Sequence, residues 1–415
     1  MIIDTLGMNA LEAKKQIGIM SSYDKNAILF KISENLLKEA SSIIEVNAGE
    51  VETARQNGTS GPMLDRLRLD EKRINGMSDA LLELMNAPDP VGRILDGSTR
   101  PNGMQIRKVT VPFGVVGMIY ESRPNVTVDA GSLAIKSGNA VILRGGKEAV
   151  KTNTLLADIM RRSIASSGFD ENIVQIITDT SHETADLFMK ANDYLDLLIP
   201  RGGRSLIKSV VKNATVPVIE TGTGNCHIYV DYNADIDMAV DIADNGKTQR
   251  PGVCNALESC LVHESAAEKF LPALASRFKE HNVELRGDER TREILGDSVV
   301  PVTEEDYATE FLDYIMSVRV VDSLDTAIKH IQKYSTGHSE VIVTNDYSNA
   351  AKFQQRIDSA CVYVNCSTRF TDGGEFGLGA EIGISTQKLH ARGPMGLSEL
   401  TTYKYLINGS GQVRP

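Results

Sequence analysis

The chain has 415 residues, more than one hydrophobic core usually organises, so two or three domains are expected. Its 41% hydrophobic and 24% charged residues are typical of a globular protein in water. The formal net charge of −11 argues against nucleic-acid binding, and the lack of an apolar stretch of about 20 residues argues against a membrane-spanning helix. We therefore expect a cytoplasmic protein that binds small molecules and neither nucleic acid nor a membrane.

The cysteines are odd in number, and no two of them form the C-x-x-C pair of a zinc or dithiol redox site. We expect reduced thiols and no bound metal. The five are Cys226, Cys254, Cys260, Cys361 and Cys366.

The first part of the chain is predicted to be helical. Apolar residues at helical spacing predict one amphipathic helix over residues 25–55, and a more polar helix is expected over residues 70–86. Turn residues then interrupt the pattern, and residues 100–110 are predicted to form a polar hairpin or arm.

Short apolar runs begin at residue 115 and alternate with helical patterns. Strands are expected at residues 115–120, 140–143, 173–177, 195–199, 216–219 and 228–230. Helices are expected between them at residues 128–137, 147–166 and 183–190. This alternation is typical of a doubly wound parallel sheet, which often binds a nucleotide at the carboxyl ends of its strands.

A second α/β pattern follows. It predicts helices at residues 236–247, 266–280 and 325–334, and strands at residues 261–263, 319–321, 340–344 and 362–365. Residues 401–407 alternate like an edge strand that could pair with another subunit. We expect a cofactor-binding domain of residues 1–99 and 113–233, a catalytic domain of residues 234–385, and a small oligomerisation arm of residues 100–112 and 400–415. The chemistry is expected in the interdomain cleft.

One cysteine lies in an unusual turn. The segment Lys247-Thr-Gln-Arg-Pro-Gly-Val-Cys254 places it between a predicted helix and an apolar strand. A cysteine close to Arg250 can have its thiolate stabilised, although most lone cysteines are small buried hydrophobic residues. We expect the other four cysteines to be small buried hydrophobic residues. Cys254 is distinguished from them because its surroundings match a known family.

Four segments carry that match: Gly114-Val-Val-Gly117, the run from Ser137 to Glu148, Glu220-Thr-Gly-Thr-Gly, and the Cys254 turn. In order and spacing the chain resembles the aldehyde dehydrogenase superfamily. Three further segments narrow the resemblance to the γ-glutamyl phosphate reductase family: residues 119–127, 247–251 and 372–386. The resemblance implies an aldehyde dehydrogenase-like α/β fold, with a doubly wound cofactor domain, an α/β catalytic domain and a small oligomerisation arm.

The resemblance also implies an enzyme of proline biosynthesis. It would reduce L-glutamyl 5-phosphate to L-glutamate 5-semialdehyde with NADPH, releasing phosphate. In this mechanism the Cys254 thiolate attacks the acyl phosphate, and the resulting thioester accepts a hydride more readily than a carboxylate does. The oxyanion would be held by the Cys254 backbone N–H and the Asn125 side chain, although asparagine is also an ordinary turn residue.

Two glutamates match positions of the superfamily. Glu220 matches the glutamate that activates water in hydrolytic members. Activating water would be wasteful in a reductase, so we rank Glu220 as a secondary site residue that packs against the cysteine turn or contacts nicotinamide. Glu310 matches the glutamate that holds the nicotinamide ribose, and a solvated helix glutamate is the alternative.

No G-x-G-x-x-G follows a predicted strand, and the superfamily binds its dinucleotide without that motif. Arg144 and Lys147 follow a predicted strand where the superfamily contacts the adenosine ribose, and two cations there suit the 2′-phosphate of NADPH. The backbone N–H groups of Gly202 and Gly203, at a predicted helix start, suit the pyrophosphate, with a plain βα turn as the alternative.

The substrate carries an acyl phosphate and an α-carboxylate, so its site needs cations. Arg123, Arg250 and Arg369 each lie in a segment that matches the family, although loop arginines are most often solvated.

Two other functions remain open at this point. One is a hydrolytic NAD(P)-dependent aldehyde dehydrogenase that acts on an amino-aldehyde through Glu220. The other is a catalytically silent nucleotide-binding protein. Partners implied by the resemblance are further copies of the chain, as a dimer or a tetramer, and glutamate 5-kinase as a candidate donor of the labile acyl phosphate.

Overall fold

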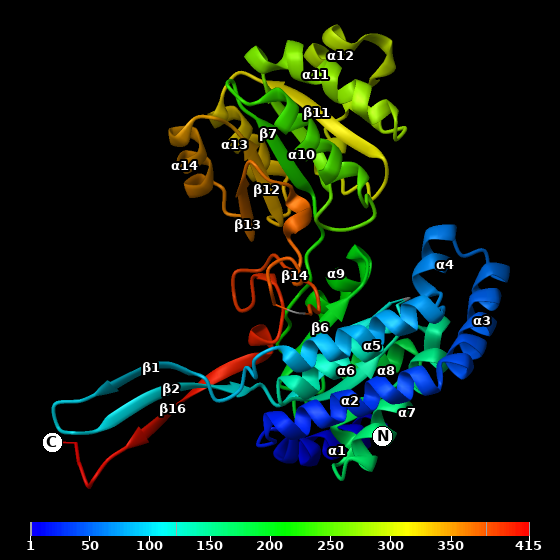
Figure 1. The fold of residues 1–415 in the computed structure, drawn as a ribbon, viewed down its shortest axis with the longest axis vertical. Helices are drawn as coiled ribbons and strands as arrows, with labels where there is room; N and C mark the ends of the chain where they lie inside the picture. The colour runs from blue at the N-terminus through cyan, green and yellow to red at the C-terminus, as the bar shows by residue number, and fades with distance from the viewer. Residues whose placement is uncertain (1, 122, 379, 415) are drawn as a thin grey trace. The chain divides into compact units, whose positions relative to one another are not determined.

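The structure is a computed structural model that describes residues 2–121, 123–378 and 380–414. The chain divides into two compact units (Figure 1). The first unit comprises Met1–Thr221, Gly377–Gly383 and Met395–Pro415, and the second comprises Gly222–Phe376 and Ile384–Pro394. No helix among the described residues is both long and apolar enough to cross a membrane.

The first unit begins with helices: α1 (Ile2–Ile17), α2 (Ser22–Lys38), α3 (Ala40–Gln56), α4 (Gly61–Leu67) and α5 (Glu71–Asn86). The single helix expected over residues 25–55 is wrong, because α2 ends at Lys38 and α3 begins at Ala40, with Glu39 between them. The apolar periodicity continues across Glu39, so the sequence pattern could not show the break. The polar helix expected over residues 70–86 is confirmed as α5, whose start is fixed by the Asp70 side chain accepting from the Arg73 N–H at 2.9 Å.

The first sheet consists of four parallel strands in the order β5-β4-β3-β6. The strands are β3 (Val115–Tyr120), β4 (Ala140–Arg144), β5 (Val174–Ile176) and β6 (Leu197–Arg201). Each is followed by a helix, in turn α6 (Asn125–Lys136), α7 (Val150–Ser166), α8 (His182–Met189) and α9 (Arg204–Asn213). Every residue of β3 is buried, as expected for a strand covered on both faces. The strand expected at residues 216–219 is reduced to an isolated bridge between Leu198 and Val218.

A three-stranded antiparallel sheet also belongs to the first unit. It consists of β1 (Ile94–Thr99), β2 (Gln105–Pro112) and β16 (Thr401–Asn408), drawn as the cyan and red arrows in Figure 1. The predicted hairpin and the predicted C-terminal edge strand are thus confirmed, and they pair with each other along the whole of β16. The residues of β16 after Thr401 are exposed.

The second unit contains a seven-stranded parallel sheet in the order β10-β9-β11-β8-β7-β12-β13. The strands are β7 (Cys226–Val230), β8 (Leu257–His263), β9 (Glu284–Gly287), β10 (Val300–Pro301), β11 (Ile315–Val321), β12 (Ser339–Val343) and β13 (Cys361–Val364). The helices are α10 (Ile236–Thr248), α11 (Glu264–Lys279), α12 (Glu289–Leu295), α13 (Leu324–Tyr334) and α14 (Tyr347–Arg356). The doubly wound α/β architecture predicted from the sequence is confirmed.

Strand β7 differs from its expected place. A domain boundary after residue 233 assigns it to the first sheet, whereas its ladders with β8 and β12 place it in the second. The strand itself was predicted correctly, but its pairing partners lie far away in the chain and leave no local signal.

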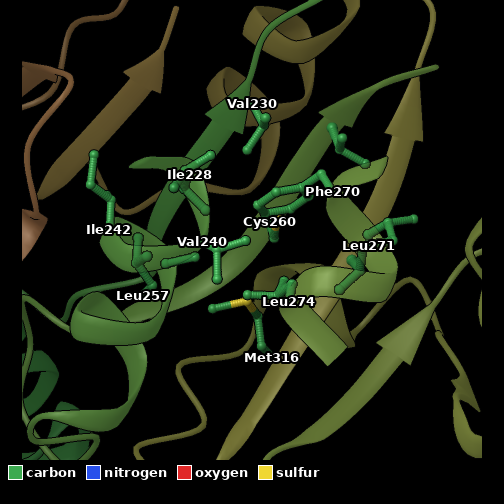
Figure 2. Packing of buried hydrophobic residues seen from close by; sticks show 14 of the residues in the cluster. Ile228, Val230, Val240, Ile242, Leu257, Cys260, Phe270, Leu271, Leu274 and Met316 are labelled. Carbon is green, nitrogen blue, oxygen red and sulfur yellow. The ribbon is translucent and has the colours of Figure 1, made fainter. Parts of the chain in front are cut away.

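The second sheet has a hydrophobic cluster on each face. Figure 2 shows one of them, in which Ile228 and Val230 of β7 pack with Phe270 and Leu274 of α11. Tyr229, between those two strand residues, belongs to the opposite cluster with residues of α13 and α14. This alternation explains the continuous apolar runs, since both faces of each inner strand are buried.

Candidate active site

Cys254 lies in the turn between α10 and β8. Helix α10 begins where the Asp235 side chain accepts from the Met238 N–H at 3.0 Å, and it ends at Thr248, shortly before Pro251. Cys254 is half-buried, whereas Cys226, Cys260 and Cys361 are buried. Burial raises the pKa of the Cys260 thiol to about 12, which suits its predicted role as an inert hydrophobic residue.

The backbone of Gly224 packs directly against the cysteine. A Cβ at position 224 would lie 2.8 Å from the Cys254 Cα and closer still to its carbonyl group. The Cys226 Sγ donates to the same Cys254 carbonyl at 3.2 Å. The close approach of the two backbones thus explains why residue 224 is a glycine.

Glu310 contacts the same segment. Its Oε1 accepts from the Gly224 backbone N–H at 2.7 Å. It is half-buried and follows a short 3-10 turn at Asp306–Ala308, so it is not the solvated helix glutamate of the alternative. Its predicted contact with the nicotinamide ribose stays a prediction.

Arg369 is held by two residues of the cysteine turn. Its Nε donates to Gln249 Oε1 at 2.8 Å, and its Nη1 donates to Asn255 Oδ1. Asn255 in turn donates from its Nδ2 to the Thr371 carbonyl at 2.8 Å. Neither Gln249 nor Asn255 was predicted as a site residue, although both lie within five residues of the cysteine.

Arg369 and Arg250 form a cationic pair near the cysteine. Burial lowers the pKa of the Arg369 guanidinium, and the charge of the exposed Arg250 lowers it further, whereas Asp372 and the Cys254 thiolate raise it. Arginine stays protonated at physiological pH, so both side chains are available to stabilise anions at this turn.

Asn125 is the first residue of α6 in the first unit. Its Nδ2 donates to Asp129 Oδ2, one helical turn later, at 2.8 Å. Burial raises the pKa of Asp129 to about 6, against the opposing effects of the Asn125 hydrogen bond and the Arg201 charge. Arg123 precedes this helix and is half-buried, and its carbonyl accepts from the Val126 N–H at 3.0 Å.

The two predicted cofactor cations behave differently. Arg144 ends β4 and donates from its Nη2 to the carbonyls of Thr180 and Ser181, at 3.2 and 2.8 Å. Its Nε is buried and has no hydrogen-bond partner among the described residues. Burial lowers the pKa of this guanidinium, and Asp179 opposes the shift. Lys147 begins the next turn and is exposed.

The glycine loop before α9 is engaged by a carboxylate. The Gly203 backbone N–H, predicted for a pyrophosphate, donates to Glu121 Oε2 at 2.7 Å. A Cβ at Gly202 would lie 2.8 Å from the Glu121 carboxyl carbon. Glu121 directly follows β3 and was not predicted, although it belongs to the matched segment of residues 119–127. Glu220 is half-buried and belongs to the first unit, at the end of the segment after α9.

Two buried groups close to the cysteine turn were not predicted from the sequence. Lys247 Nζ and Glu258 Oε2 form an ion pair at 2.6 Å, and both side chains are fully buried. The residues next to Gly224 are held by β12 and the segment that leads into it. Thr336 Oγ1, before the strand, accepts from the Asn225 N–H at 3.0 Å, and Glu340 Oε2, in the strand, accepts from the His227 N–H at 2.8 Å. The run Tyr334-Ser-Thr-Gly-His-Ser-Glu340, dense in small polar residues before a buried strand, was the available signal.

Among the described residues, no group of three or more His, Cys, Asp or Glu side chains is arranged to hold a metal ion.

The chain is similar to known proteins over nearly its whole length. The aldehyde dehydrogenase family matches residues 3–315 and 299–405. A γ-glutamyl phosphate reductase of Clostridium perfringens (strain SM101 / Type A) is 57% identical over 408 residues, 98% of each chain. One of Caldanaerobacter subterraneus subsp. tengcongensis is 54% identical over 414 residues, 100% of each chain.

Solved structures give the same result. The crystal structure of γ-glutamyl phosphate reductase from Thermotoga maritima matches with a TM-score of 0.97 at 49% identity, covering 100% of each chain. An acetylating aldehyde dehydrogenase from Geobacillus thermoglucosidasius matches with a TM-score of 0.72 at 18% identity, over 100% of this chain and 97% of the other, and so shows the fold alone. The chain therefore belongs to the aldehyde dehydrogenase family and, within it, to the γ-glutamyl phosphate reductases.

Proposed function

We propose that this protein reduces L-glutamyl 5-phosphate to L-glutamate 5-semialdehyde in proline biosynthesis, with NADPH as the reductant and phosphate as the leaving group, in the cytoplasm. The observation that carries the proposal is a half-buried Cys254 in a turn that also positions Arg369, in a chain 57% identical to a γ-glutamyl phosphate reductase. Neither the hydrolytic nor the silent alternative is supported by the relatives.

The first step belongs to Cys254. Its thiolate attacks the acyl carbon, a carbon–sulfur bond forms, and the carbon–oxygen bond to phosphate breaks with its electron pair leaving on phosphate. Arg250 and Arg369 neutralise charge on the thiolate and the departing phosphate. Because Gln249 and Asn255 hold Arg369, its guanidinium keeps one orientation during this step.

The oxyanion of each step needs fixed donors. We assign them to the Cys254 backbone N–H and the Asn125 amide. An asparagine amide has two N–H donors, and Asp129 takes one of them, which fixes the direction of the other. Arg123 is proposed to bind a carboxylate of the substrate. Glu220 is proposed to pack or to contact nicotinamide, because activating water would hydrolyse the thioester.

The residues at the carboxyl edge of the first sheet fit a phosphorylated dinucleotide. Arg144, whose buried Nε has no hydrogen-bond partner among the described residues, ends β4. Exposed Lys147 follows that strand, and a glycine loop follows β6. Cations there suit a 2′-phosphate. Backbone N–H groups at the start of α9 suit a pyrophosphate, which would have to replace the Glu121 carboxylate on the Gly203 N–H. NADPH, when bound, supplies the hydride that converts the thioester to the aldehyde. Glu310, which is held on the Gly224 N–H, is proposed to hold the nicotinamide ribose.

The requirement for phosphate tests the proposal. In the reverse direction, glutamate semialdehyde and NADP should give NADPH only when phosphate or arsenate is added. Glu220→Gln should keep this dependence, and Cys254→Ser should abolish the reaction. Equal rates without either anion, together with loss of activity in Glu220→Gln, would replace the proposal by the hydrolytic one.

We also propose that copies of the chain associate through the arm. Strand β16 exposes Tyr403, Tyr405 and Ile407 at the edge of its sheet, and an exposed edge strand is a template for pairing. Light scattering should give the mass of a dimer or a tetramer, and deletion of residues 401–415 should give a monomer. Glutamate 5-kinase is the proposed source of the acyl phosphate. Adding this kinase to the purified protein tests that source.

A further inference from the structure

We propose that the buried ion pair of Lys247 and Glu258 is a positioning device, which fixes Glu310 relative to Cys254. Neither side chain is assigned to the substrate or the cofactor. The inference rests on the function proposed above, because the benefit of this position is hydride transfer to a thioester on Cys254.

The pair connects the two ends of the cysteine turn. Lys247 lies in the last turn of α10, and Glu258 is the second residue of β8, so the turn that carries Cys254 spans the residues between them. Lys247 Nζ and Glu258 Oε2 are 2.6 Å apart, and neither side chain is exposed. The separation of the helix end and the strand start is therefore fixed by a charge-assisted contact inside the unit.

Stability does not explain an ion pair at this place. Burial lowers the pKa of Lys247 and raises the pKa of Glu258 to about 7, so each charge is desolvated at a cost that the partner offsets. An apolar pair of similar volume usually stabilises a buried position at least as well. What distinguishes a carboxylate here is that it accepts two hydrogen bonds from fixed directions.

The other carboxylate oxygen of Glu258 holds the segment that contains Leu312. Its Oε1 accepts from the Leu312 backbone N–H at 3.1 Å. Leu312 has a φ of 56°, in the left-handed region that a leucine rarely adopts, so this backbone must be held by its surroundings. Glu310 lies two residues earlier in the same segment.

These contacts form a closed circuit. Glu258 holds Leu312, the same segment presents Glu310 to the Gly224 N–H, and the Gly224 backbone packs against the Cys254 carbonyl. The ion pair joins Glu258 to Lys247, at the other end of the cysteine turn, and so closes the series of contacts. A change at Glu258 should consequently shift Glu310 relative to Cys254 without touching either residue.

Two double variants separate the Leu312 contact from the charge. Lys247→Met with Glu258→Leu removes the ion pair and the acceptor for the Leu312 N–H. Lys247→Met with Glu258→Gln removes the same charges but keeps an oxygen that can accept this N–H. We expect the leucine variant to lose about 10- to 100-fold in kcat, because small misplacements cost this much, and the glutamine variant to stay within about threefold of the wild type.

A control variant removes an ion pair in the first unit in which the lysine is buried and the aspartate is 20% exposed. Lys25 is 1% exposed and its Nζ is 3.0 Å from Asp89 Oδ2. Lys25→Met with Asp89→Leu should leave kcat unchanged. Thermal unfolding reports whether each variant is folded, and hydrogen exchange of the segment around Leu312 reports its mobility independently of activity. Exchange should be faster in the leucine variant and unchanged in the glutamine variant.

Several outcomes overturn the inference. A folded leucine variant with wild-type kcat, or equal losses in the leucine and glutamine variants, would show that the Leu312 contact does not position the site. If the leucine variant does not fold, unchanged exchange and kcat in the glutamine variant support the inference, and faster exchange there overturns it. Failure of the proposed function is distinct, since wild-type protein would then lack phosphate-dependent activity while the exchange results would still stand.

Discussion

Replacing Gly224 by alanine should damage the active site more than the fold. The added Cβ would lie 2.8 Å from the Cys254 Cα and closer to its carbonyl. Since non-bonded carbon atoms settle about 3.5–4.0 Å apart, the two backbones must separate by about 1 Å at the Cα and by more at the carbonyl group, so about 1 Å is the smallest misplacement. A misplacement of that size can cost about 100-fold in rate, equivalent to about 2.7 kcal/mol of transition-state stabilisation.

The assay is steady-state reduction of NADP by glutamate semialdehyde and phosphate, combined with the rate of Cys254 alkylation by iodoacetamide and with thermal unfolding. Gly76→Ala is the control, because a Cβ at that position in α5 would meet nothing within 4 Å, and the helix should gain up to about 1 kcal/mol. A folded Gly224→Ala variant with wild-type kcat and wild-type alkylation would refute the reasoning that this packing holds Cys254 in place.

Cys254→Ser should lower turnover by several orders of magnitude, as loss of a covalent nucleophile does, whereas Cys366→Ser should change it little. Replacing Arg144 and Lys147 together by alanine should raise the KM for NADPH about 10-fold or more while leaving that for NADH nearly unchanged, because NADH has no 2′-phosphate to lose. The pKa of Asp129 is raised from 3.8 to about 6, so the wild type should lose up to about 3 kcal/mol of stability as the pH rises from about 4 to about 6. Asp129→Asn removes this loss and should be the more stable protein at pH 8 by urea unfolding, with the difference closing towards pH 4.

Each of these has a contradicting result. Activity retained in Cys254→Ser would end the thioester mechanism. Equal losses for NADPH and NADH would make Arg144 and Lys147 packing residues and move the 2′-phosphate site to Arg201 and Arg204. A pH-independent difference between wild type and Asp129→Asn would show that the Asp129 carboxylate is not desolvated in the folded chain.

Regular segments were predictable because their signal is local. The buried runs that became β3 and β4, and the apolar stripe of α10, could be recognised from a few neighbouring residues. The break at Glu39 could not, because the apolar stripe runs through it and only the backbone geometry interrupts the helix. The sheet to which β7 belongs was decided by its ladder to β12, where Glu340 accepts from the His227 N–H across 113 residues of sequence.

The site divides in the same way. Cys254, Arg250 and Arg369 could be proposed from motifs, because each lies in a short segment of distinctive residues. Their partners could not be, since the contact of Gln249 with Arg369 spans 120 residues and that of Gly224 with Glu310 spans 86. Such contacts depend on how strands and helices pack, and packing is a property of the whole unit rather than of any one segment. The sequence by itself thus determined the fold class and predicted Cys254 and its turn as the place of the nucleophile, and the tertiary structure decided which buried groups hold that turn in place.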